Sequence, residues 1–153
     1  MKSTKLESGL LIRPARTSDV AAIRALCQPL IDERILVPKD HVNYFENIQE
    51  FMVVTDSDGT LVGCAALHVF WEDLAEVRTV ATSAQFRRRG VGRALIETIE
   101  RDPLFLRAPR VVIPASINAL HFYQELGYAF APGGDRLDEE QLYCLEKFPQ
   151  RSV

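Results

Sequence analysis

One segment of the sequence brings together residues that could bind phosphate, and it reads Arg87-Arg88-Arg89-Gly90-Val91-Gly92-Arg93. Its glycines would let the backbone turn tightly and approach a ligand closely. If a helix begins here, its unpaired amides and its dipole favour an anion. The four arginines add enough positive charge for more than one phosphate. The segment therefore predicts a binding site for a pyrophosphate group.

Two other phosphate-binding motifs do not match this segment. A Walker-type loop would need Gly-Lys-Ser or Gly-Lys-Thr here, and a dinucleotide-binding loop would need Gly-x-Gly-x-x-Gly. A glycine-capped turn beside a solvated basic surface remains the structural alternative. An RNA-binding module is disfavoured, because the net charge is −3 and the strands lack aromatic residues arranged for base stacking. We therefore expect no nucleic-acid partner.

Apolar runs before the arginine-rich segment predict three consecutive strands. They span residues 51–55, 61–71 and about 74–82, and they are rich in β-branched and aromatic residues. The polar stretch at residues 56–60 is typical of a hairpin turn. The three strands are expected to form an antiparallel meander. The arginine-rich segment would then follow the last of them.

The segments that come next predict a crossover to a parallel strand. Residues 90–101 have helical apolar spacing, and residues 110–114 form a short apolar run. A strand, a helix and a strand in series form a right-handed βαβ unit. The strands near Thr79 and Val112 should therefore be parallel neighbours, and the sheet should mix parallel with antiparallel pairing.

The remaining elements lie near the two ends of the chain. A strand at residues 10–12 precedes a helix capped by Thr17-Ser18-Asp19, and residues 117–126 predict a last helix before closing strands near residues 128–130 and 141–147. The expected fold class is therefore α/β (α+β). We expect a single domain with a central mixed, mostly antiparallel sheet flanked by about four helices.

Length and composition bound the organisation of the chain. Its 153 residues fit one domain, which we place at residues 10–149, after a flexible tail at residues 1–9. No apolar run approaches the ~20 residues of a membrane span, and the start lacks a secretory signal. We therefore expect a cytoplasmic protein without a membrane partner. The three cysteines lie far apart, without histidine at ligand spacing, so no metal is expected.

Two motifs of the chain resemble the signatures of a known family. The pattern Arg-x-x-Gly-x-Gly, which follows a strand ending Val80-Ala81-Thr82, is similar to the coenzyme A signature of the GNAT N-acetyltransferases. About thirty residues later, Asn118-Ala119-x-x-Phe122-Tyr123-x-x-x-Gly127-Tyr128 resembles the second signature of that family. The likeness covers roughly residues 11–147. It implies the GNAT fold and acetyl-CoA as cosubstrate.

The resemblance also implies which residues bind the cofactor. In this family the strand that matches residues 76–82 carries a bulge, and its exposed backbone pairs with the pantetheine arm. The residues in this role would be Val80, Ala81 and Thr82. The arginine-rich segment would hold the pyrophosphate through its backbone amides. Asn118 would contact the arm near its thiol end.

An acid and a base follow from the same resemblance. An amine must lose a proton to attack a thioester, because an ammonium group has no lone pair. Glu76 matches a position where several family members place a glutamate that accepts this proton, often through water. Tyr123 matches the position that protonates the departing thiolate, and a phenol with a pKa near 10 suits that task. The alternatives are an ion pair of Glu76 with Arg78, a different base or water chain, and plain core packing of Tyr123.

A finer similarity concerns the acceptor. Residues 35–51, 63–67 and 76–81 resemble the acetyltransferase domain of N-acetylglutamate synthases, especially the short stand-alone type. The resemblance implies transfer of acetyl from acetyl-CoA to the α-amino group of L-glutamate, the first step of arginine biosynthesis. The reaction would proceed by direct attack in a ternary complex.

Glutamate has two carboxylates, so its pocket should hold at least two cations. We expect these to be Lys39 and Arg78, with Arg34 as a third. Glutamine, another amino acid, a polyamine or a protein amine stay open as acceptors, and so does a coenzyme A-binding regulator without turnover. An acyl carrier based on Cys64 is disfavoured, because His68 would lie roughly 13 Å away along a strand. Many family members pair, so a homodimer is left open.

Overall fold

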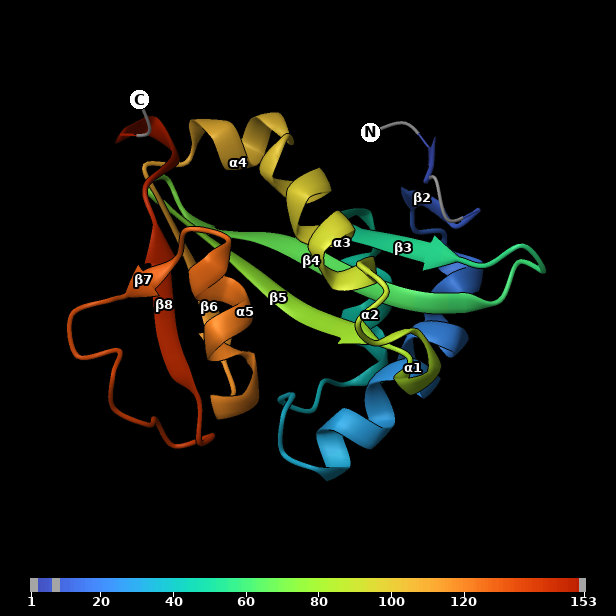
Figure 1. The fold of residues 1–153 in the computed structure, drawn as a ribbon, viewed down its shortest axis with the longest axis horizontal. Coiled ribbons are helices and arrows are strands. Elements are labelled where there is room, and N and C mark those ends of the chain that lie inside the picture. The colour runs from blue at the N-terminus through green and yellow to red at the C-terminus, as the bar shows by residue number, and fades with distance from the viewer. Residues whose placement is uncertain (1–2, 7–8, 152–153) are drawn as a thin grey trace. The chain divides into compact units, whose positions relative to one another are not determined.

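The computed structural model describes residues 3–6 and 9–151. The chain divides into two compact units, one of residues 1–66 and 79–102 and one of residues 67–78 and 103–153 (Figure 1). Two long strands, β4 (Leu61–Trp71) and β5 (Leu74–Thr82), run through both units. The single domain expected at residues 10–149 stays a prediction.

The tail expected at residues 1–9 is described only in part, because residues 1, 2, 7 and 8 lie outside the described residues. Strand β1 (Thr4–Lys5) falls within this tail. It pairs antiparallel with β2 (Leu11–Pro14), with Thr4 opposite Ile12. This part of the predicted tail therefore has a partner in the sheet.

The strands hydrogen-bond in the order β1-β2-β3-β4-β5-β6-β8-β7. The other strands are β3 (Phe51–Thr55), β6 (Arg110–Ala115), β7 (Ala129–Phe130) and β8 (Tyr143–Lys147). The β5–β6 pair is parallel, whereas β1–β2, β2–β3, β3–β4, β6–β8 and β7–β8 are antiparallel. The predicted mixed, mostly antiparallel sheet is therefore confirmed.

The parallel pair confirms the predicted crossover. In its register, Val112 lies opposite Glu76. The connecting helix is α3 (Val91–Glu100), and a short helix α4 (Pro103–Arg107) follows it. The helix predicted over residues 90–101 thus ends at Glu100, and Pro103 begins a second helix. A proline is also well placed at the first position of a new helix, because its missing N–H needs no acceptor there.

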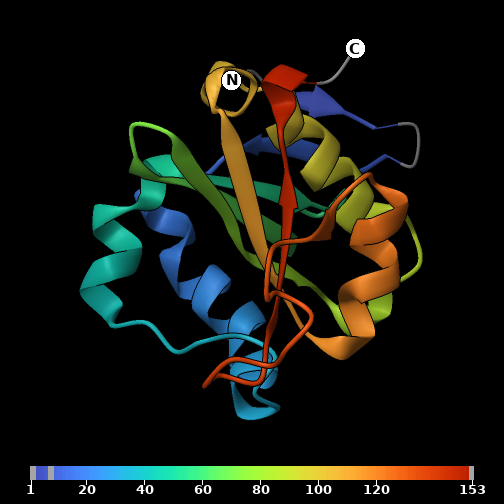
Figure 2. The same cartoon turned by 90° about the vertical axis from the view of Figure 1, so that its left-hand side faces the viewer.

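In the first unit, helices α1 (Val20–Asp32) and α2 (His41–Glu46) pack on β3, β4 and β5. Figure 2 shows both helices in blue and teal. Apolar residues at helical spacing give α1 one buried face. The core cluster consists of Val20, Ile23, Cys27, Leu30, Tyr44, Ile48, Phe51, Val53, Cys64, Ala66 and Ala81. This cluster includes two of the three cysteines, as expected for small buried apolar residues.

In the second unit, β6 and β8 run side by side (Figure 2), with Val111 opposite Lys147. The last helix, α5 (Leu120–Glu125), begins after a 3-10 helix at Ile117–Ala119. The sequence predicted one helix over residues 117–126, but its first turn takes the narrower form that is common at helix starts. Further 3-10 helices lie at Thr17–Asp19, Ile48–Glu50, Ala84–Phe86 and Pro149–Arg151.

Candidate functional site

The arginine-rich segment connects β5 to α3 in the first unit. The 3-10 helix Ala84–Phe86 leads from the end of β5 toward the arginines. Before it, Ser83 donates its backbone amide to the carbonyl of Val62, 2.8 Å away. Gly90 then precedes α3 with a φ of +79°, which glycine adopts without the strain that a Cβ would cause. The glycine therefore permits the tight turn that the sequence suggested.

The first turn of α3 is open to a ligand. No side chain caps this end of the helix. The amide of Ala94 donates to the carbonyl of Gly90 at 2.9 Å. The amides that precede Ala94 in the first turn have no acceptor within an α-helix. Backbone donors of this kind, together with the helix dipole, favour an anion.

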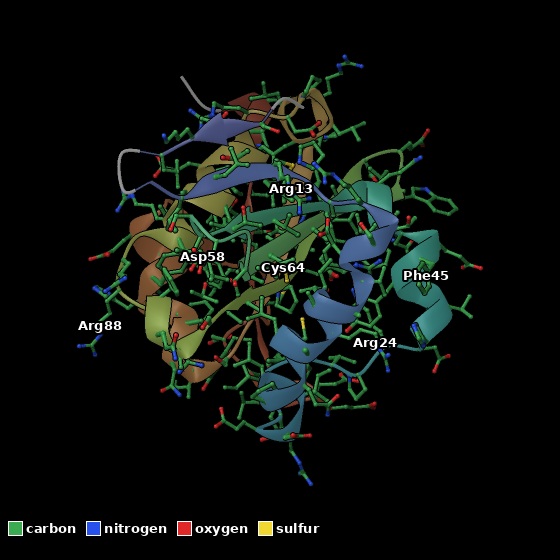
Figure 3. All side chains as sticks on the ribbon, turned by 90° about the vertical axis from the view of Figure 1, so that its right-hand side faces the viewer. Arg13, Arg24, Phe45, Asp58, Cys64 and Arg88 are labelled. Carbon is green, nitrogen blue, oxygen red and sulfur yellow. The ribbon has the colours of Figure 1, made fainter. Side chains whose placement is uncertain are left out.

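All four arginines of the segment are exposed. Figure 3 shows Arg88 extending away from the body of the molecule. The guanidinium of Arg89 lies 5.2 Å from the centroid of the Phe86 ring, and Nε of Arg93 donates to Glu97 at 3.1 Å. An exposed pair of this kind contributes about 0.3–0.5 kcal/mol. Arg93 can therefore exchange Glu97 for a phosphate at little cost.

Gly63 of β4 allows α3 to pack closely against the sheet. A Cβ at this position would lie 2.6 Å from Cγ1 of Val91 and 3.6 Å from the carbonyl oxygen of Ala81. The start of α3 therefore packs against β4 without an intervening side chain. This packing role of Gly63 was not predicted from the sequence. The available signal was an isolated glycine within a strand pattern, which indicates a close approach of another element.

Thr79 interrupts the extended geometry of β5. Its φ is +56°, and only 7% of the residue is exposed. A β-branched residue rarely adopts this left-handed conformation, because of steric clashes with the backbone. The family resemblance implied a bulge in this strand, and Thr79 marks the point where the strand departs from regular geometry.

Two side chains of the first unit hydrogen-bond to Thr79. The ammonium of Lys39 donates to its Oγ1, and the thiol of Cys64 donates to its carbonyl, with 3.3 Å between Sγ and O. The ammonium of Lys39 also lies 5.8 Å from the ring centroid of Tyr44 and 5.4 Å from that of Phe51. Lys39, expected to bind the acceptor, is thus held at the irregular point of β5.

The expected base, Glu76, forms an ion pair with Arg78 in the second unit. NH1 of Arg78 lies 3.7 Å from Oε1 of Glu76, and the two side chains are 21% and 18% exposed. The guanidinium lies 5.6 Å from the centroid of the Phe70 ring, which meets His68 edge to face at 5.0 Å. Nε of Arg78 is buried without a hydrogen-bond partner among the described residues. The structure thus contains the ion pair of Glu76 with Arg78 that was the alternative to a catalytic role. Neither side chain is fully exposed at the surface.

Tyr123, the expected acid, is buried in α5 with 5% of its area exposed. Its ring centroid lies 5.1 Å from that of Phe122 and 6.2 Å from that of Tyr128. Burial raises the pKa of Tyr123 above its ordinary value, because a low-dielectric environment disfavours the phenolate. The phenol therefore stays protonated at neutral pH, as a proton donor must. Two other predicted residues, Asn118 before α5 and Arg34 after α1, are exposed.

Both signature segments lie within a stretch that matches a known protein family. Residues 19–128 match the family model described as acetyltransferase (GNAT) family. The chain belongs to the GNAT family. The resemblance drawn from the two sequence motifs is therefore confirmed, and so is the GNAT fold.

Several named proteins are similar to this GNAT chain. The amino-acid acetyltransferase of Mycobacterium tuberculosis is 40% identical over 105 residues, which cover 67% of this chain and 60% of that protein. N-acetylglutamate synthase from Neisseria gonorrhoeae, solved with coenzyme A and N-acetyl-glutamate, matches with a TM-score of 0.82 and 27% identity over 95% of this chain and 36% of that one. A Mycobacterium tuberculosis protein in complex with CoA gives a TM-score of 0.70 and 35% identity, covering 84% of this chain and 77% of that one. The GNAT chain thus spans less than two thirds of the first two proteins.

The thiol of Cys64 does not suit the acyl-carrier alternative. Cys64 is fully buried, and its Sγ lies 4.0 Å from that of Cys27. The hydrogen bond with Cys27, together with burial, raises the pKa of Cys64. The thiolate is the nucleophilic form of cysteine, so a thiol that stays protonated is a poor acyl acceptor.

A concave region also lies in the second unit. A cavity of about 350 Å³ is lined by Asp73, Leu74, Pro109, Arg110, Phe148 and Gln150. None of the site residues predicted from the sequence lines it. Residues 3–6 and 9–151 contain no group of three or more His, Cys, Asp or Glu able to hold a metal ion. Within the same ranges, no helix has the length and apolar character needed to cross a membrane.

Proposed function

We propose that this chain transfers the acetyl group of acetyl-CoA to the α-amino group of L-glutamate. The observation that carries the proposal is the stretch from Thr79 to α3, where an irregular strand is followed by a glycine turn, an uncapped helix start and four exposed arginines. Such a stretch offers backbone groups to a pantetheine arm and donors to a pyrophosphate, the two parts of coenzyme A. Membership of the GNAT family supports the same chemistry.

In this proposal the cofactor is bound mainly by the backbone of the first unit. Val80, Ala81 and Thr82 follow the irregular point of β5 and pair with the pantetheine arm. The segment at residues 87–93 binds the pyrophosphate, with amides as directional donors and arginines as charges. Asn118, which is exposed, contacts the arm near its thiol end. The similar proteins solved with coenzyme A support this choice of cofactor.

The acceptor amine attacks the thioester carbonyl directly in a ternary complex. Glu76 accepts the proton that the amine loses, either directly or through a water molecule. The new C–N bond forms, the C–S bond breaks, and the coenzyme leaves as a thiolate. Tyr123 donates its proton to that thiolate. The raised pKa of Tyr123 keeps the phenol protonated before this transfer, and solvent restores the proton afterwards.

Glutamate is the proposed acceptor because of the similar proteins and because of Arg78. One relative is named amino-acid acetyltransferase, and one structural neighbour is an N-acetylglutamate synthase. A guanidinium binds a carboxylate through two parallel hydrogen bonds, and that of Arg78 rests on Phe70 with Nε lacking a partner among the described residues. Lys39 and Arg34 are the further cations that we propose for the acceptor. The reaction would be the first step of arginine biosynthesis.

The test measures release of free coenzyme A thiol with a panel of amines: glutamate, glutamine, other amino acids, polyamines and a peptide. Wild type is compared with Glu76→Gln and with Glu146→Gln. The second variant is a matched control, since Glu146 also forms a half-buried ion pair, with Arg110 at 2.8 Å. We expect turnover with glutamate that Glu76→Gln lowers by about 100-fold or more and that Glu146→Gln largely preserves.

The possible results separate the parts of the proposal. Preferred turnover with another amine would remove glutamate as the acceptor and leave the acetyl transfer in place. Equal losses in both glutamate variants would remove Glu76 as the base. Binding of acetyl-CoA without acetylation of any amine would make the chain a coenzyme A-binding regulator, and the roles of Glu76 and Tyr123 would fall.

A further inference from the structure

We infer that Lys39 and Cys64 are positioning residues for the cofactor: their hydrogen bonds hold Thr79 in its left-handed conformation and thereby fix the backbone at residues 80–82. This inference rests on the proposed function, because it assigns residues 80–82 to acetyl-CoA. It gives Lys39 a role distinct from binding the acceptor, and it gives the buried Cys64 a role that the sequence did not suggest.

Thr79 holds a strained backbone conformation. A β-branched residue with a φ of +56° is a conformational outlier. Such residues persist only when their surroundings determine the conformation. Glycine would adopt this φ without strain, yet the chain has threonine here. The threonine hydroxyl is the acceptor that Lys39 uses, which gives a reason for the residue type.

Lys39 is itself held in place by its surroundings. It follows α1 in the chain and is half-buried. Its ammonium lies 5.8 Å from the ring centroid of Tyr44 and 5.4 Å from that of Phe51. Two aromatic rings within 6 Å favour a cation at this point. The ammonium therefore donates to Oγ1 of Thr79 from a fixed position.

A second side chain contacts the main chain of Thr79. Cys64 of β4, in the interior of the molecule (Figure 3), donates its thiol to the carbonyl of Thr79 across 3.3 Å. Sγ of Cys27 lies 4.0 Å from Sγ of Cys64. The raised pKa of Cys64 keeps its proton available for donation. Because Cys64 has no exposed area, bulk water does not compete for this hydrogen bond.

These contacts bear on the cofactor through the end of β5. Ala81 lies two residues after Thr79 and approaches the position where Gly63 admits α3. If Thr79 relaxed to an extended conformation, the following residues would rotate, because a large change in one φ angle reorients the chain beyond it. Residues 80–82 would then present different backbone groups beside the helix start. We therefore expect loss of either donor to weaken binding of acetyl-CoA.

The experiment measures the Kd of acetyl-CoA by calorimetry for variants of the full chain. Lys39→Met and Thr79→Val each remove one side of the same hydrogen bond, so each should raise Kd about fivefold, and the double variant should be no worse than either alone. Cys64→Ala should also raise Kd, whereas Cys64→Ser keeps a donor and should restore affinity. Thr79→Gly should bind as wild type, and Lys39→Met should add no loss in that background.

A second readout reports the conformation directly. In NMR spectra of the same variants, a strong contact between the amide proton and Hα of residue 79 marks the left-handed conformation. We expect this contact in wild type and its loss in Lys39→Met. Retention of both the contact and the affinity in Lys39→Met, with only a higher KM for glutamate, would overturn the inference and leave Lys39 as an acceptor-binding residue.

Two further results are decisive. If Cys64→Ser binds acetyl-CoA as weakly as Cys64→Ala, and Thr79→Gly as weakly as Thr79→Val, then the two positions matter only for packing. That result also overturns the inference. If wild type fails to bind acetyl-CoA, the proposed function is wrong. Lys39 and Cys64 then have no role in positioning a cofactor. That result differs from failure of the positioning role alone, in which wild type binds acetyl-CoA and the Lys39→Met variant binds it equally well.

Discussion

The two units of the chain hold their functional groups in different ways. In the first unit the features are those of the main chain: Thr79, Arg88 and Gly90 all have positive φ, and α3 begins without a side-chain cap. In the second unit the functional groups are side chains whose chemistry depends on their neighbours. Glu76 is paired with Arg78, and Tyr123 is buried. A short sequence motif can specify backbone geometry, whereas the environment of a side chain depends on residues far away in sequence.

The strongest test of this contrast removes a single hydroxyl from the second unit. Tyr123→Phe should lower kcat by about 10²-fold or more, because the thiolate loses its proton donor, and the KM for acetyl-CoA should change little. Steady-state kinetics would measure both constants. Tyr128→Phe is the matched control, since its ring packs against Tyr123. Similar kinetics for the two variants would show that Tyr123 serves only packing.

In the first unit the corresponding test concerns close packing. Gly63→Ala places a methyl group 2.6 Å from Cγ1 of Val91, so we expect a loss of about 1–3 kcal/mol in the free energy of unfolding. Urea denaturation would measure it. Adding Val91→Ala should recover part of the loss, because it removes the clashing atom. An unchanged free energy in the single variant would contradict the close approach of α3 to β4.

Alkaline pH should reveal a buried group of the first unit. Burial of Tyr44 raises its pKa to about 12, above the value near 10 of an unfolded chain. The folded state therefore holds the proton longer, so stability is complete below pH 10 and declines as the pH rises toward 12. We expect Tyr44 to contribute a fall of about 1 kcal/mol in the free energy of unfolding between pH 10 and 11, beside a similar fall from the buried Tyr123. Tyr44→Phe should flatten this part of the profile, and an equally steep profile would count against the assignment.

The smallest expected effect lies at the exposed arginines. Glu97→Gln removes the partner of Arg93 and should change the free energy of unfolding by less than about 0.5 kcal/mol. The variant should also bind acetyl-CoA slightly more tightly. Arg93 no longer has to leave a carboxylate before it contacts a phosphate. Calorimetry at low salt and at about 1 M salt would show whether the gain disappears with screening. A gain that persists at high salt would point to a cause other than charge.

Local signals explain why most of the sheet could be predicted from the sequence. The boundaries of β3, β4 and β5 agree with the β-branched and aromatic runs, and α3 begins directly after Gly90. Hairpin and crossover rules then gave the pairing directions. These features depend on neighbours in sequence, which is why a single chain was sufficient to predict them.

Other features could not be read locally. Nothing in the run of residues around Thr79 signals a positive φ, because threonine disfavours it and the stabilising partners, Lys39 and Cys64, come from other elements. The contact between Cys27 and Cys64 likewise joins two distant segments. Pro103 was ambiguous, since proline is common both after a helix and at the start of one.

The most direct test of the division between the two units is a paired measurement on Gly90→Val and Glu76→Gln, with the Kd of acetyl-CoA and kcat determined for both. Gly90 has a φ of +79°, and an added Cβ would meet no atom within 4 Å, so a β-branched residue would mainly strain the turn. We predict that Gly90→Val loses affinity for acetyl-CoA, whereas Glu76→Gln binds it normally and fails to turn over. Normal binding by Gly90→Val, or loss of binding by Glu76→Gln, would contradict the assignment of cofactor binding to the first unit and of proton transfer to the second.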